Sequence, residues 1–126
     1  MRAHIHTPDP GDEFATDERC LILELLNTPA DADVSIARAR VAPGVTTRRH
    51  RLHGTAERYL ILAGSGRVEI GNLPARDVKA GDVVSIPALC PQRIANVGDD
   101  DLVFLAVCTP RFRPEIYEDI DGSVVV

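Results

Sequence analysis

Short apolar segments separated by turn-forming residues recur along most of this chain, and this pattern constrains its fold more than any other feature. Glycine, proline, asparagine and aspartate fill the gaps, and Gly64-Ser65-Gly66 is typical of a hairpin turn. No helical period extends beyond a turn or two, and short strands at regular spacing are typical of antiparallel sandwiches and barrels. The sequence therefore predicts an all-β protein. Strands are expected at residues 20–27, 34–41, 46–52, 58–63, 67–70, 83–86, 92–97 and 102–108, with one more after Pro74.

Composition excludes several classes of partner. The 126 residues suffice for one domain with a real core, and 44% apolar and 26% charged residues are typical of globular proteins. A net charge of −5, no tryptophan and few other aromatic residues argue against a nucleic-acid partner, which needs a basic face. The longest apolar run, residues 102–108, is too short to cross a bilayer. No signal peptide is visible, so we expect a cytoplasmic protein with no membrane partner.

The order of the segments divides the chain into three parts. Residues 1–18 are polar and rich in proline and aspartate, which predicts an N-terminal arm. Residues 19–108 contain the predicted strands and form the barrel, and residues 109–126 are expected to be a C-terminal tail packing on it. The three cysteines lack zinc-site spacing and are interpreted as free thiols in a reducing compartment.

Two stretches, residues 44–66 and 81–96, carry most of the polar side chains expected in a pocket. Four arginines flank this pocket in an otherwise acidic protein. Their forked guanidinium groups would suit a small anion such as a carboxylate or a sugar phosphate. The simpler alternative is that they are solvated or paired with the loop residues Asp82, Asp99 and Asp100. The arginines concerned are Arg48, Arg49, Arg51 and Arg58.

The same two stretches resemble the two motifs of the cupin family. Gly44, His50, Glu57 and Gly64 stand at the spacing of the first motif, G-x5-HxH-x3-4-E-x6-G. The second motif, G-x5-PxG-x2-H-x3-N, is matched at Gly81, Pro87 and Asn96. The resemblance covers residues 34–108 and implies a double-stranded β-helix, the jelly-roll barrel of the cupin type. The strand pattern predicts the same kind of fold independently.

The resemblance also implies a divalent metal, such as Fe, Mn, Ni or Zn, although two ligand positions differ. His50 and Glu57 match the family ligands, but Leu52 and Gln92 stand where the other two histidines would be. His53 lies one residue late and points to the opposite face of a regular strand, unless a bulge turns it inward. The candidate metal ligands are therefore His50, Glu57, Gln92 and His53. The alternative is a metal-free polar network in which His50, Glu57 and Gln92 hydrogen-bond to one another.

Two functions remain open at this point, and whether the protein is an enzyme is left undecided. The first is a metal-dependent cupin acting on a small polar or anionic molecule, with Tyr59 as catalytic acid or base and Arg48, Arg58 and Gln92 binding the ligand. The second is a metal-free module that binds a small molecule without catalysis. The chain is also similar to the small single-domain group related to the C-terminal domain of mannose-6-phosphate isomerase. That resemblance implies a homodimer. Ile116, Tyr117 and residues 124–126 of the tail could cover a partner or the chain's own sheet edge.

Overall fold

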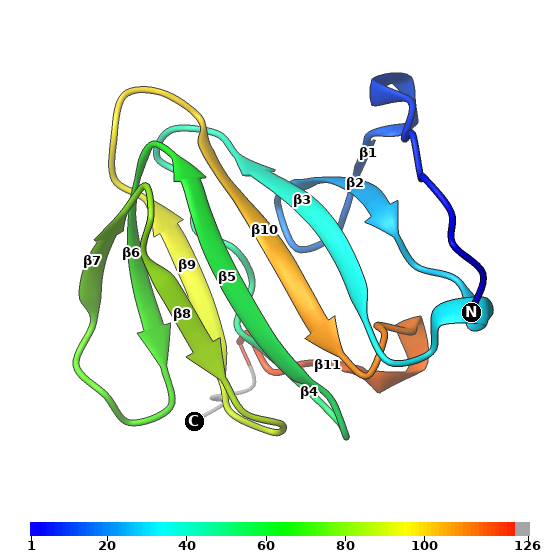
Figure 1. The fold of residues 1–126 in the computed structure, drawn as a ribbon. Helices are drawn as coiled ribbons and strands as arrows, with labels where there is room; N and C mark the ends of the chain where they lie inside the picture. Colours follow the sequence, from blue (N-terminus) through cyan, green and yellow to red (C-terminus); the bar gives the residue numbers. More distant parts are fainter. Residues whose placement is uncertain (123–126) are drawn as a thin grey trace.

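Two antiparallel sheets face each other in the computed structural model, which describes residues 1–122 (Figure 1). One sheet has the strand order β1-β2-β3-β10-β5-β8, and the other has the order β11-β4-β9-β6-β7. The strands are β1 (Phe14–Ala15), β2 (Leu21–Leu26), β3 (Ser35–Val41), β4 (His50–Leu52), β5 (Ala56–Ala63), β6 (Ser65–Ile70), β7 (Arg76–Lys79), β8 (Val83–Ile86), β9 (Gln92–Asn96), β10 (Leu102–Thr109) and β11 (Tyr117–Asp119). Three short 3-10 helices, η1 (Pro10–Asp12), η2 (Pro29–Asp31) and η3 (Pro114–Ile116), lie between them.

This architecture is the all-β, double-stranded β-helix that the sequence predicted. Each expected strand is present, although the segment expected at residues 46–52 is regular only in β4, with Thr46 forming an isolated bridge to Ala95. The topology depends on contacts between distant segments, since β10 lies between β3 and β5 and pairs with both. Two strands were not expected, β1 in the N-terminal segment and β11 in the tail. Both are too short to give a period that the sequence alone would reveal.

The core lies between the sheets and is built from alternate residues along each strand, those whose side chains face inward. Ile61, Ile86, Ile94 and Leu102 are among its fully buried side chains. At the sharp turn between β5 and β6, Gly64 has a φ of +87°, and a Cβ there would lie 2.6 Å from a backbone oxygen of the β9–β10 loop. Only glycine fits this turn without moving the neighbouring chain.

The segment after β10 turns back and adds β11 to the edge of the second sheet, beside β4 (Figure 1). Acidic side chains of this segment then pair with arginines around β4, through Arg48 Nε to Asp119 Oδ2 at 2.7 Å and Arg51 Nε to Glu118 Oε1 at 2.8 Å. Ile116 packs with Leu52 and Cys108 in a small second cluster. The tail residues 124–126 that were expected to cover a partner or a sheet edge lie outside the described residues. Within residues 1–122, no helix has the length and apolarity that crossing a membrane requires.

Candidate functional site

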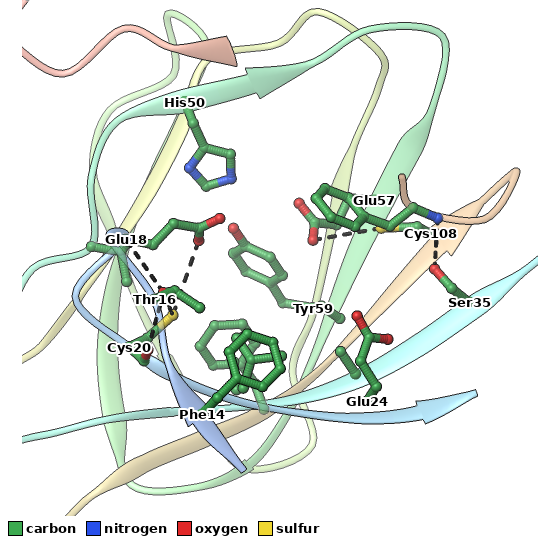
Figure 2. Close-up of a pocket in the computed structure, with 17 residues that line it drawn as sticks. Phe14, Thr16, Glu18, Cys20, Glu24, Ser35, His50, Glu57, Tyr59 and Cys108 are labelled. Atoms are coloured by element: carbon green, nitrogen blue, oxygen red, sulfur yellow. Dashed lines mark hydrogen bonds between the residues drawn. The ribbon is translucent and has the colours of Figure 1, made fainter. Parts of the chain in front are cut away.

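A cavity of about 160 Å³ opens on the inner face of the first sheet and is drawn in Figure 2. Its walls are largely apolar and come from β2, β3 and β10, with Phe104 and Ala106 among the lining residues. Its polar lining is concentrated around His50 of β4 and Glu57 and Tyr59 of β5. Three carboxylates line it, those of Glu18, Glu24 and Glu57. The cavity therefore combines a hydrocarbon-like wall with an acidic end.

Glu57 is the most deeply buried of the three carboxylates that line the cavity. Alternation along β5 turns both Glu57 and Tyr59 inward, as their separation of two residues predicted, and Glu57 is only 8% exposed. Its Oε2 accepts a weak bond from the Cys108 thiol at 3.7 Å, whereas its Oε1 is buried with no hydrogen-bond partner. Burial raises the pKa of Glu57 to about 7, with His50 opposing the rise and Glu18 adding to it. An unpartnered acceptor of this kind is unusual in a folded protein and needs a donor from elsewhere.

Tyr59 and Gln92 form a closed pair beside Glu57. The Tyr59 hydroxyl donates to Gln92 Oε1, and the Tyr59 ring packs on Phe104 with centroids 4.5 Å apart. Gln92 Oε1 is the atom that would bind a metal, but here it accepts the hydrogen bond from Tyr59. Burial also raises the pKa of Tyr59 well above its usual value, so the group stays neutral near pH 7. Tyr59 therefore acts in this arrangement as a hydrogen-bond donor to Gln92.

His50 lies over the polar end of the cavity and is held from two sides. Its Nδ1 lies 2.9 Å from the backbone oxygen of Arg48, which can only accept, so Nδ1 carries the proton in the neutral ring. Tyr117 of β11 stacks on the imidazole at 5.0 Å. The remaining ring nitrogen, Nε2, is then the acceptor of the neutral ring. His50 is 4% exposed, so its orientation is fixed by packing.

Glu18 belongs to the site, although no motif or spacing in the sequence singles it out. It lies between β1 and β2, in the segment that was expected to be an arm, and its carboxylate points into the cavity opposite Glu57 (Figure 2). Its position is fixed by its backbone, since its carbonyl accepts from the Arg48 amide at 3.1 Å and its amide donates to Thr16 Oγ1 at 3.2 Å. Burial raises the pKa of Glu18, with His50 lowering it. Glu24 also lines the cavity, at its exposed rim. In the sequence, a single charged residue within an apolar strand was the one feature that could have pointed to Glu24.

Four predicted site residues do not line the cavity: Gln92, which accepts from Tyr59, and His53, Arg48 and Arg58. The His53 side chain is 54% exposed, and its Nε2 lies 2.7 Å from Glu118 Oε1, so no bulge turns it inward and its inclusion among the candidate metal ligands was wrong. The reason is that β4 keeps regular alternation, with His50 and Leu52 inward and Arg51 outward. Arg48 is paired with acidic residues of the tail, and Arg58 is exposed and donates to Thr109 Oγ1 at 2.7 Å. Neither arginine lines the cavity, so the structure does not bring them to a ligand there.

The donor set does not fit a divalent metal of the kind the family motif implies. Within residues 1–122, no three His, Cys, Asp or Glu side chains are placed to hold one ion. Gln92 is engaged by Tyr59, and Leu52, at the second histidine position, packs into the apolar cluster with Cys108 and Ile116. His50 and Glu57 alone are too few ligands for a stable site, because protein metal sites use three or more. We derive no chemistry through a metal.

The cysteines are free, as the sequence analysis expected, and two of them are buried. Cys20 and Cys108 line the cavity, and burial raises the pKa of Cys20 to about 11 and that of Cys108 further still. Thiols with raised pKa values remain protonated near neutral pH and are poor nucleophiles. Both are therefore part of the wall of the cavity.

Comparison with known proteins places this arrangement in a family. Residues 37–108 match the model of the cupin domain family Cupin_2. An uncharacterized protein of Methanocaldococcus jannaschii is 32% identical over 110 residues, which cover 86% of this chain and 87% of the relative. An oxalate-binding protein of Thermotoga maritima is 39% identical over 71 residues, 56% of this chain and 58% of that protein.

A similar fold is found among solved structures. Oxalate decarboxylase from Bacillus subtilis superposes with a TM-score of 0.79 at 20% sequence identity, covering 95% of this chain and 33% of that protein. At this identity the likeness concerns the fold alone. The family match and the M. jannaschii relative extend over most of the barrel. The chain belongs to the cupin family.

Proposed function

We propose that this barrel binds a small organic molecule directly through its own side chains, without a divalent metal. The observation that carries the proposal is Glu57 Oε1, a buried acceptor with no partner that lines an otherwise apolar cavity. A ligand hydroxyl or amino group supplies the donor that the protein lacks there. A hydrogen bond to a charged acceptor contributes about 1.5–3 kcal/mol, enough to orient a small ligand.

The size and walls of the cavity limit the ligand. An apolar cavity of about 150 Å³ holds a molecule of the size of benzene, so a volume of about 160 Å³ suits about six non-hydrogen atoms. The hydrocarbon part would pack on Phe104 and Ala106, and the polar group would face Glu57 and His50. His50 Nε2 is available as a second acceptor, while Tyr59 is kept in place by Gln92. These residues bind and orient a ligand, and nothing in their arrangement requires a reaction.

The name of the T. maritima relative supports binding of a small molecule by a cupin of this size, but oxalate itself is a poor match to this cavity. Oxalate carries two negative charges, and the cavity is lined by three carboxylates with no arginine or lysine among its lining residues. Arg48 and Arg51 pair with acidic residues of the tail, and Arg58 donates to Thr109 Oγ1. We therefore extend to this chain only the small-molecule binding.

The proposal is tested with cyclopentanol, a neutral donor of six non-hydrogen atoms, titrated into ¹⁵N-labelled full-length protein. We expect saturable amide shifts around β4, β5 and β10, and loss of binding in Ala106→Leu, which fills the cavity from its apolar wall. Val83→Ala, on the exposed side of β8, is the matched control and should leave binding unchanged.

Metal content is measured in parallel, by elemental analysis after incubation with Fe(II), Mn, Ni and Zn. We expect less than one ion per chain and no difference between the wild type and His50→Ala. One ion per chain that disappears in His50→Ala would refute the metal-free proposal and favour the metal-dependent alternative.

A further inference from the structure

We propose that the cavity selects a small organic ammonium ion, a primary amine on a compact hydrocarbon group, over neutral or anionic molecules of the same size. The inference rests on the proposed function, because it concerns the same cavity. It goes further by assigning the charge of the ligand, and the sign is opposite to that of the anionic ligand considered in the sequence analysis and of the oxalate in the name of the T. maritima relative.

The arrangement of acidic groups is the first observation. Figure 2 shows the carboxylates of Glu18 and Glu57 pointing from opposite sides toward the space beneath His50. They come from segments far apart in the chain, the β1–β2 connection and β5, so the fold brings them together. Glu24 adds a third carboxylate at the rim. A group placed between Glu18 and Glu57 therefore has negative charge on two sides.

The absence of compensating charge is the second observation. None of the described residues that line the cavity is an arginine or lysine, and Glu57 Oε1 is left without a donor. The nearby Arg48 is turned to the outside, where Asp119 and Asp121 hold it. Buried carboxylates without cations are costly unless a partner neutralises them. Burial raises the pKa of both Glu18 and Glu57, so at lower pH a proton can neutralise each group, whereas at a pH where both are ionised a cationic ligand supplies the partner.

The number of donors on an ammonium group matches these acceptors. It carries three donors and no acceptor, and the cavity offers it Glu57 Oε1, the Glu18 carboxylate and His50 Nε2. Hydrogen bonds between ionised partners are about twice as strong as neutral ones. Phe104 and Phe14 line the same cavity and offer the hydrocarbon group of the ligand an apolar surface. A neutral alcohol has one donor and leaves most of these acceptors unpaired.

A divalent metal is a weaker match to the same charges. As described above, no three ligand side chains within residues 1–122 are close enough together for one ion. An organic ammonium ion spans a wider gap, because its three hydrogen bonds are longer than metal–oxygen bonds. It also uses the apolar wall, which contributes about 25 cal/mol for each Å² that is buried.

The test compares three ligands of six non-hydrogen atoms each: cyclopentylammonium, cyclopentanol and cyclopropanecarboxylate. Each is titrated by calorimetry into the full-length protein at pH 8 and low salt. We expect cyclopentylammonium to bind at least about tenfold more tightly than cyclopentanol, which is about 1.4 kcal/mol, and cyclopropanecarboxylate to bind more weakly than both. Glu18→Gln should remove most of the preference for the ammonium ion while leaving cyclopentanol binding within about twofold.

A control variant and the contrary outcomes complete the design. Glu69→Gln removes a surface carboxylate that pairs with Arg93 at 2.6 Å, changes the net charge by the same amount and should not alter the preference. Equal affinities for cyclopentylammonium and cyclopentanol, both lost in Ala106→Leu, would refute the charge selection and leave the proposed function standing. No binding of any of the three would refute both. Tighter binding of cyclopropanecarboxylate would refute the charge selection and return the site to an anionic ligand.

Discussion

Replacing Glu57 by glutamine should change the pH dependence of stability in a direction that the structure fixes. Glu57 is buried in the folded protein, where its pKa is raised from an ordinary value of 4.5 to about 7. Below pH 4.5 both the folded and the unfolded protein hold this proton, so the group has no differential effect. Between pH 4.5 and pH 7 the unfolded chain releases the proton first, and the free energy of unfolding therefore falls as pH rises. Above pH 7 the full cost of burying the charge is present.

The magnitude follows from the same two pKa values. A difference of one pH unit corresponds to about 1.4 kcal/mol, so the complete effect is about 3 kcal/mol, and about 2–3 kcal/mol of it falls between pH 5 and pH 8. Glutamine has nearly the same shape and carries no charge. The Glu57→Gln protein should therefore gain about 2–3 kcal/mol relative to the wild type when the pH is raised from 5 to 8. Other titrating groups are present in both proteins, and most of their contribution cancels in the difference.

The assay is urea denaturation of both proteins at pH 5 and pH 8, with the free energy of unfolding extrapolated to water. Glu69→Gln is the matched control, because Arg93 holds the pKa of Glu69 below its usual value, which makes its effect opposite in sign. That pair is partly exposed, so its loss should cost under about 1 kcal/mol. A difference between wild type and Glu57→Gln that stays constant within about 0.5 kcal/mol at the two pH values would show that Glu57 is solvated or already neutralised.

Two further predictions concern packing and backbone conformation. Leu52→Ala should lower the free energy of unfolding by about 2–5 kcal/mol, because Leu52 is 3% exposed and packs in the second cluster with Cys108 and Ile116. A loss below about 1 kcal/mol in urea denaturation would contradict that packing. Gly64→Ala should cost more than Gly81→Ala, since both glycines have positive φ but only the first would place a Cβ against backbone, at 2.6 Å. Gly81→Ala should cost about 1–2 kcal/mol for its conformation alone, and equal losses in thermal unfolding would contradict the predicted clash at Gly64.

Much of the barrel and part of the site could be predicted from local pattern. A strand has a period of two residues, so the sequence showed that Glu57 and Tyr59 share a face, and the structure confirms that both are buried. The same rule argued that His53 faces away from His50, and the structure shows it exposed. Turn residues at regular spacing predicted short antiparallel strands, which are present. These features depend on residues close together in the chain, so they can be predicted from the sequence.

Charge placement around the site depended on contacts between distant segments. The arginines near residue 50 were expected to pair with aspartates of the barrel loops or to bind an anion, whereas the structure pairs Arg48 and Arg51 with residues of the tail. Glu18 likewise reaches the cavity because β1 joins the sheet beside β2.

The sequence by itself determined the strands, the barrel and the inward direction of His50, Glu57 and Tyr59, because strand alternation and turn formation are local properties of the chain. Only the tertiary structure decided which charges face the cavity. That outcome depends on where the N-terminal segment and the tail dock, and docking is set by packing and ion pairing across separations such as the 71 residues between Arg48 and Asp119. The periodicity of a short segment gives no information about a contact between residues so far apart in the chain.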